Sequence, residues 1–457
     1  MKPVILWSDY LLFILVLALG SFIISLIRNR QNRERWSKVF KTRLGISTFL
    51  IILTYVLVAL LDSFHFRQAL PSVEGQPENQ VYYSNEVNSV LDLLLGEMGD
   101  NIERTYSQPF SLKSYSKIFM QNAQGETVRD FPDLKFAGQH LSDNNKWLTD
   151  IVIQSFKAIS IGLLISALLV LLHKWWRKED SNYPWSTAYC TITVIICILC
   201  WLLHVGNLYH VLGTDKAGND VLYKCIKGIR TGILIGTLAT LIMMPIAITL
   251  GIAAGYFKGW VDDLIQYLYT TLSSIPGILI ISASVLLFQV WIDLNPDYFE
   301  TGLQKADARF IALCFILGVT SWATLCRLLR AETLKISQLD YVQAAHAFGV
   351  SHFRILRRHI LPNVLHIILI TFILDFSTLV LAEAVLSYVG VGVDASMHSW
   401  GNMISAGSSE LSRSPVIWWN LVGTFVFMFG LVLAANLFSD LVNDAFDPRS
   451  RLGGSQS

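Results

Sequence analysis

Long apolar runs alternate with shorter polar connections along most of this 457-residue chain. A helix of about 20 apolar residues is long enough to cross the hydrocarbon core of a bilayer. The pattern therefore predicts about nine membrane-spanning helices and an all-α polytopic membrane protein. We place the predicted spans at about residues 8–27, 44–62, 151–172, 186–206, 229–255, 264–290, 308–327, 366–389 and 417–439.

Basic residues in the short connections predict which helix ends face the cytoplasm. The connection between the first two spans is strongly basic, and against the single acid Glu34 it holds Arg28, Arg30, Arg33, Arg35, Lys38, Lys41 and Arg43. If this connection lies inside, the span count also places the basic residues of 330–358 in the cytoplasm. The N-terminus is then expected outside and the C-terminus inside.

Residues 64–150 interrupt the series of spans and are expected to form an extracytoplasmic domain. Residues 117–120 and 126–131 alternate as strands do, whereas residues 86–101 have the spacing of an amphipathic helix. This mixture predicts a small α+β domain. It shows no convergent set of polar residues, so docking of the partner that delivers the substrate is favoured over ligand sensing.

Composition agrees with a membrane protein, because 53% of the residues are hydrophobic and only 15% are charged. The formal net charge is +1, and no basic tract is interleaved with aromatic residues. Nucleic acid is therefore not an expected partner.

One polar segment between two apolar runs, residues 340–363, reads DYVQAAHAFGVSHFRILRRHILPN. Its alanines favour a helix that another surface can approach closely, and Gly349 can end that helix in the left-handed conformation. Ser351 can cap a second helix, and Pro362 is tolerated at the start of the next one. The pattern predicts a helical hairpin with a hinge at Gly349.

This segment resembles the cytoplasmic loop of ABC importer permeases, which has the form E-A-A, three residues, Gly, nine residues, I-x-L-P. The positions that match are Ala344, Ala345, Gly349, Leu361 and Pro362. Gln343 replaces the Glu of the family, and His359 replaces its Ile. The run RHILPN at 358–363 is typical of the dipeptide and oligopeptide branch. The resemblance implies that residues 330–365 couple the permease to an ATPase, with Asp340 and Gln343 in the coupling helix.

A second segment, residues 212–221, resembles the LGTD-x-x-G-R-D-V motif of peptide-type permeases, with Asn219 in place of Arg. Its motif residues include Gly213, Thr214, Asp215, Gly218 and Asp220. The predicted topology puts this segment outside, where the glycines permit tight turns and the acids can cap the next helix. Turn formation and direct substrate contact are equally good interpretations.

Three residues inside apolar runs are candidates for the translocation pathway. Pro276 lies in an S-I-P sequence that the family shares, and it is expected to bend or break its span for gating or for packing. Asp375 and Glu383 are acids within a predicted span, where an ionisable group is costly unless it faces protein or water.

Three further runs resemble the peptide permeases in the same order along the chain: EAVLSYVGVGV at 383–393, SWGNM at 399–403 and DAFDPR at 444–449. The resemblance implies a six-span permease core. The predicted organisation is two N-terminal spans with a basic loop (1–63), the extracytoplasmic domain (64–150), a further span and linker (151–180), the core (181–447) and a cytoplasmic tail (448–457).

The resemblance also implies the function and the partners. The chain is expected to be an inner-membrane permease that moves peptides or related small solutes by ATP-driven alternating access. The implied partners are a second homologous permease, two ATP-binding cassette ATPase subunits, an extracytoplasmic substrate-binding protein and membrane lipid. The sequence has no P-loop or dinucleotide fingerprint, so we expect no enzymatic activity, cofactor or metal site in this chain.

Two alternatives follow from the residues alone. An ion-coupled secondary transporter would use Asp375 and Glu383 to bind its ion. A membrane-anchored sensor would use residues 64–150 as its receptor. The substrate is open among dipeptides, oligopeptides, antimicrobial peptides, glutathione and nickel complexes.

Overall fold

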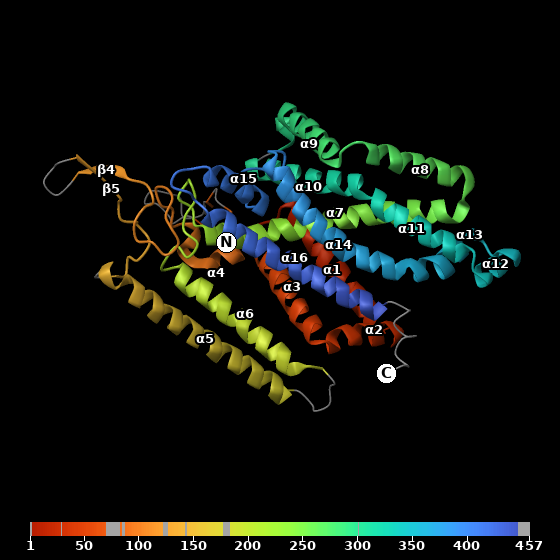
Figure 1. Cartoon of the computed structure of the whole chain (residues 1–457), viewed down its shortest axis with the longest axis horizontal. Coiled ribbons are helices and arrows are strands. Elements are labelled where there is room, and N and C mark those ends of the chain that lie inside the picture. Colours follow the sequence, from red (N-terminus) through yellow and green to blue (C-terminus); the bar gives the residue numbers. More distant parts are fainter. Residues whose placement is uncertain are drawn as a thin grey trace, which may run out of the picture. The chain divides into compact units, whose positions relative to one another are not determined.

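The computed structural model describes residues 2–28, 30–69, 83–84, 87–121, 127–141, 144–176, 183–299 and 301–446. Most of these residues are helical, as Figure 1 shows, and the strands form two small sheets. The chain divides into two compact units. Four helices contribute to both units: α1 (Trp7–Arg28), α2 (Arg30–Lys41), α7 (Val221–Phe257) and α16 (Trp419–Phe446).

The first unit consists of Met1–Leu12, Phe40–Gly232 and His398–Ala434. Its other helical elements are α3 (Arg43–Asp62), α4 (Val90–Leu95), η1 (Gly96–Gly99), η2 (Asn144–Lys146), α5 (Trp147–Trp176), α6 (Trp185–Gly206) and α15 (Trp400–Leu411). α5 and α6 pack along each other as a helical hairpin, in which Gly162 allows close contact with the backbone of Cys197. α3 contacts α6, and its Tyr55 donates a hydrogen bond to the Phe427 carbonyl of α16 at 2.9 Å.

Two small antiparallel sheets lie in this unit. In the first, β1 (Lys2–Val4) pairs with β2 (His65–Arg67), which pairs with β3 (Asn88–Ser89). The second is the hairpin of β4 (Ile118–Gln121) and β5 (Thr127–Asp130). β2 to β5 and α4 confirm the mixture of strand and helix expected within residues 64–150, and the separate domain stays a prediction.

The predicted helix over residues 86–101 is wrong in its extent, because α4 covers only Val90–Leu95. Ser89 caps the helix through its side chain, and Gly96 leaves the helical conformation with φ +65°. The Ser89 cap and Gly96 both lie inside the stretch of amphipathic spacing, and that spacing by itself does not show where the helix begins or ends.

The second unit consists of Phe13–Val39, Ile233–Met397 and Ala435–Ser457. Its other helical elements are α8 (Gly259–Ser274), α9 (Gly277–Leu294), η3 (Pro296–Tyr298), α10 (Gly302–Ser321), α11 (Ala323–Ser337), α12 (Asp340–Ala347), α13 (His352–Ile355), η4 (Leu356–Ile360) and α14 (Leu361–Tyr388). Gly251 and Gly255 of α7 lie against the backbone of α11. Around this contact a buried apolar cluster joins α7, α8, α11 and α14.

Eight of the predicted spans correspond to segments that are long and apolar enough to cross a membrane: Arg43–Asp62, Trp147–Trp176, Trp185–Gly206, Val221–Phe257, Gly277–Leu294, Gly302–Ser337, His352–Tyr388 and Trp419–Phe446. The ninth, residues 8–27, coincides with α1. The prediction of one span over 264–290 is corrected, since the chain breaks there between α8 and α9. The predicted tail, 448–457, and residues 447–449 of the DAFDPR run lie outside the described residues.

The contact between α7 and α11 leads to a stability prediction. A Cβ atom at Gly251 would lie 2.8 Å from the Cys326 carbonyl oxygen, whereas one at Gly277 would meet nothing within 4 Å. Because the backbone cannot easily give way, Gly251→Ala is expected to destabilise the protein by roughly 1–3 kcal/mol. Gly277→Ala should leave stability unchanged or raise it slightly. The measurement is the thermal unfolding midpoint in detergent, and equal midpoints for the two variants would contradict this packing.

Candidate functional site

The 340–363 hairpin begins with α12, which ends in a Schellman motif. Gly349 has φ +74°, a conformation that glycine adopts without strain. Its N–H donates to the His346 carbonyl at 3.0 Å, and the Val350 N–H donates to the Ala345 carbonyl at 3.1 Å. These bonds satisfy carbonyls that the helix end would otherwise leave open. The predicted helix end is therefore confirmed, and the hinge stays a prediction.

The second arm of the hairpin differs from the prediction of a separate short helix. α13, η4 and α14 follow one another without a gap, and η4 is a π-helical turn in which the Leu361 N–H bonds to the Leu356 carbonyl. Proline lacks an N–H and its ring clashes with the carbonyl four residues earlier in an α-helix. The wider turn before Pro362 relieves this conflict. Ser351 occupies the N-cap position, but its side chain makes no capping hydrogen bond.

One face of the hairpin is anchored to its own unit. Val342, Ile355 and Ile360 are buried in the cluster that α7, α8, α11 and α14 share. At the end of α7, the Tyr256 hydroxyl lies 2.8 Å from His352 Nδ1. A displacement of the hairpin would therefore act directly on several of the predicted spans.

The rest of the hairpin surface is exposed and carries large apolar side chains among polar and basic ones. Tyr341, Phe348 and Phe353 keep 46%, 86% and 73% of their surface accessible. The predicted coupling residues that are also exposed are Asp340, Gln343, Ala344, Gly349, Leu361 and Pro362, while Ala345 is half-buried. An exposed cluster of large apolar side chains is typical of a protein-binding surface.

The motif at 212–221 lies against the predicted extracytoplasmic domain of the same unit. Gly213 and Gly218 have φ of +68° and +84°, and a Cβ atom there would lie 2.3 Å from the Ser107 carbonyl oxygen and 1.8 Å from that of Glu103. Thr214 accepts a hydrogen bond from the Ser107 N–H at 2.7 Å. Both glycines thus permit a close approach of two backbones.

A buried charge cluster completes this contact. His210 Nδ1 lies 2.6 Å from Asp220 Oδ2, and His210 Nε2 lies 3.7 Å from Glu103 Oε1. Burial by itself would lower the pKa of His210, but the contacts with Asp220 and Glu103 outweigh it and raise the pKa to about 9. Glu103 also accepts the N–H groups of Lys135 and Phe136 at 3.0 and 2.7 Å. In this structure the motif and His210 therefore hold segments of the predicted extracytoplasmic domain.

Three cations follow one face of α7 at intervals of three residues, and each pairs with acids from other segments. They are Lys224 with Asp215, Lys227 with Asp62 and Asp92, and Arg230 with Asp9. Lys227 Nζ lies 2.6 Å from Asp62 Oδ1 and 3.0 Å from Asp92 Oδ1, and Arg230 Nη2 lies 2.6 Å from Asp9 Oδ1. We call this set the α7 cation ladder.

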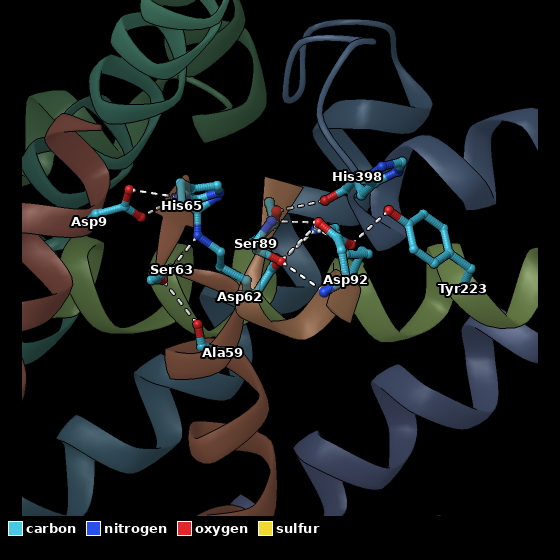
Figure 2. Close-up of polar contacts among 12 residues, drawn as sticks. Asp9, Ala59, Asp62, Ser63, His65, Ser89, Asp92, Tyr223 and His398 are labelled. Carbon is cyan, nitrogen blue, oxygen red and sulfur yellow. Dashed lines mark hydrogen bonds and ion pairs between the residues drawn. The ribbon is translucent and has the colours of Figure 1, made fainter. Parts of the chain in front are cut away.

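Figure 2 shows further members of the network around the α7 cation ladder. Asp9 turns toward His65, with 2.9 Å between Oδ2 and Nδ1, and the Tyr223 hydroxyl points at Asp92 Oδ1 at 2.9 Å. Sequence reasoning missed these residues. The signal for them is the regular spacing of three cations in an otherwise apolar helix, which requires acidic partners elsewhere in the chain.

Comparison with known proteins identifies the family. Residues 247–452 match the family described as "Binding-protein-dependent transport system inner membrane component". Over 240 residues, 52% of this chain and 73% of the relative, the chain is 30% identical to the glutathione transport system permease protein GsiD of Pectobacterium atrosepticum. Over 243 residues, 53% of this chain and 71% of the relative, it is 31% identical to the oligopeptide transport system permease protein OppC of Haemophilus influenzae. The chain belongs to this family.

A further member, the oligopeptide permease protein OppC of Bacillus subtilis, is 30% identical over 301 residues, 65% of this chain and 88% of that protein. Among solved structures, the inward-facing MetNI methionine ABC transporter aligns with a TM-score of 0.39 and 16% identity over 50% of this chain and 98% of that chain. The family model and the sequence relatives confirm the family resemblance carried by the sequence motifs. The chain is a multi-pass inner-membrane permease of an ABC import system.

The predicted pathway residues of this permease lie in different surroundings. Pro276 is exposed at the break between α8 and α9, and the expected disruption of the helix is confirmed. Asp375 is half-buried on α14. Glu383 is buried and accepts a hydrogen bond from Ser387 Oγ at 2.7 Å. Among the described residues, no three His, Cys, Asp or Glu side chains lie close enough to hold a metal ion.

The raised pKa of His210 leads to a prediction for pH dependence. The pKa lies above the ordinary value of 6.5, so its contribution to stability is complete below pH 6.5 and is lost as the pH rises through about 9. The thermal unfolding midpoint of the wild type should therefore fall over this interval, and His210→Gln should remove most of the fall. His140→Gln, at a more exposed histidine–aspartate pair, is the matched control and should keep it. Equal slopes for wild type and His210→Gln would contradict the assignment.

Proposed function

We propose that this permease imports peptides, and that the 340–363 hairpin is its contact with an ATPase subunit. The observation that carries the proposal is a hairpin whose buried side chains anchor it to the spans and whose exposed side presents large apolar side chains such as Phe348 and Phe353, at the position of the family's coupling loop. The curated relatives, which are named for oligopeptide and glutathione transport, support a peptide or peptide-like substrate.

The proposed complex contains this chain, a second homologous permease, two ATPase subunits and an extracytoplasmic binding protein. ATP binding closes the ATPase pair, and α12 passes that movement to the spans through its buried face. The outward-facing and inward-facing states differ in the contacts between the hairpin and the ATPase pair. ATP binding can therefore shift the equilibrium between the two states. The chain itself is the non-catalytic subunit, and Pro276, Asp375 and Glu383 are proposed to lie along its translocation pathway.

The proposed orientation has the N-terminus outside and the C-terminus in the cytoplasm. Pairing of β1 with β2 supports it, because the N-terminal strand then lies on the same side as the segment that follows α3. The basic connection before α3 faces the opposite side, as cytoplasmic loops do. We propose the permease core at residues 181–447, with α3 packed on it through Tyr55.

The extracytoplasmic domain is proposed to dock the binding protein rather than to sense a ligand. Its β4–β5 hairpin exposes 74% of Phe119 and 39% of Phe131, each beside a basic side chain. The His210 cluster and the two close glycine contacts tie the domain to the permease core, which would make it a stable platform.

The hinge is tested by changing Gly349. Gly349→Val places a β-branched residue at φ +74°, which is strained, whereas Asn tolerates this conformation far better. We expect Gly349→Val to lower peptide transport at least about tenfold while the complex still hydrolyses ATP, and Gly349→Asn to stay close to wild type. The measurement is uptake of labelled peptide and phosphate release in proteoliposomes. Normal transport by Gly349→Val would remove the hinge from the mechanism.

The function is tested by co-purification and uptake. An ATPase subunit should purify with the wild type, and Phe348→Glu should weaken this association because it places a charge in the exposed apolar face. Phe119→Glu, at a phenylalanine that is 74% exposed and lies outside residues 340–363, is the matched control and should retain the ATPase. Absence of an ATPase, or uptake that persists when ATP hydrolysis is blocked, would favour the sensor or the ion-coupled transporter instead.

A further inference from the structure

Polar residues follow one face of α8, which begins after the end of α7 and stops at the break before Pro276. The six residues are Asp263, Gln266, Tyr267, Thr270, Thr271 and Ser274. Their spacing of three and four residues places them on one stripe of the helix. Together they line an open pocket of about 490 Å³. We call this set the α8 polar stripe.

The direction of the α8 polar stripe is set by the other side of the helix. Ile265 and Tyr269 are buried against the apolar cluster of the second unit. Asp262 is bound to Arg330 of α11 through two hydrogen bonds, one of which joins Oδ2 and Nη2 at 2.6 Å. α8 therefore cannot rotate freely, and the stripe points away from the packed helices.

The α8 polar stripe is open to a ligand. The side chains of Asp263, Tyr267 and Thr270 are exposed and make no hydrogen bond or ion pair with the part of the chain that the structure describes. Leu264 and Leu268, 49% and 42% exposed, flank the stripe on the same helix. α8 thus presents a polar face beside an apolar one.

Most of the α8 polar stripe falls within residues 264–290, where the structure has α8 and α9 in place of one predicted span, and only α9 is by itself long and apolar enough to cross a membrane. α8 lies close to the cytoplasmic end of α7 in the proposed topology. An amide or a carboxylate that faces lipid costs free energy, so such groups in membrane helices face protein or water. The neighbouring leucines, in contrast, suit lipid. The two faces therefore separate an aqueous side of α8 from a lipid side.

We propose that the α8 polar stripe lines the cytoplasmic part of the translocation path, opposite a wall supplied by the second permease, and contacts the peptide as it leaves. This rests on the proposed peptide import. Hydroxyl and amide groups can donate and accept, so they match the N–H and C=O groups of a peptide backbone. The one charged member is the Asp263 carboxylate, which favours a solute that carries an ammonium group over an anionic one. Individual hydrogen bonds of this kind are weak enough to let the solute pass.

Accessibility to water tests the position of the stripe. In the assembled transporter, cysteines at Thr270 and Ser274 are compared with cysteines at Leu264 and Leu268 for labelling by a membrane-impermeant methanethiosulfonate sulfonate, with the wild type as background. We expect the two stripe positions to react at least about tenfold faster without nucleotide, and to slow when the ATPases are trapped with ATP and vanadate. Equal rates on both faces would show that the stripe has no special access to water. Protection of the stripe in both states would show that it packs against a partner. Either result would overturn the proposal.

Substrate preference tests the proposed chemistry of the α8 polar stripe. Wild type should import a peptide with a free amino terminus about threefold to fivefold better than its N-acetylated form, as expected for one partly exposed charge pair. Asp263→Asn should abolish this preference while ATPase association and transport of the acetylated peptide persist. Asp297→Asn, outside the stripe, should keep the preference. If wild type imports no peptide, the proposed function fails; if it does and Asp263→Asn keeps the preference, only the role of the stripe fails.

Discussion

The ion pairs of the α7 cation ladder are the interaction on which the first unit depends. Lys227 and Arg230 are both buried, and a buried charge is tolerated only when an opposite charge and hydrogen bonds replace its water. Removing one partner of such a pair typically costs about 3–5 kcal/mol, because the other charge is left buried and alone. The segments that supply the acids, at the start of α1, the end of α3 and in α4, are therefore held against one helix.

Two kinds of polar group in this permease contrast with each other. In the ladder and in the His210 cluster, charged groups are buried and paired, which fixes segments in place. Along the α8 polar stripe, the side chains of Asp263, Tyr267 and Thr270 are exposed and make no hydrogen bond or ion pair with the described residues. Both sets occur in or near spans, but they differ in their partners. The buried charges have partners within the chain, whereas the α8 polar stripe requires a solute, water or another subunit.

In the proposed complex, the hairpin would join the spans to an ATPase subunit outside the chain. Its apolar anchors, Val342, Ile355 and Ile360, bind it firmly to helices that continue into the membrane. Gly349 lies between the short helix α12 and the long continuous segment of α13, η4 and α14. A partner that moves the exposed face would move α14 as well, because α13, η4 and α14 are continuous. The π-helical turn before Pro362 preserves that continuity where an α-helix would be disrupted.

The sequence by itself determined the membrane class, the positions of most spans, the end of α12 at Gly349 and the break at Pro276. These follow from apolar length and from the local conformations of glycine and proline, which depend little on distant residues. Only the tertiary structure showed that Asp9, Asp62 and Asp92 meet α7, that the LGTD motif contacts residues 103–107, and that the polar face of α8 points away from the helices packed against it. Each of these depends on contacts between segments far apart in the chain, and hydrophobic periodicity carries no information about which acid will meet which cation.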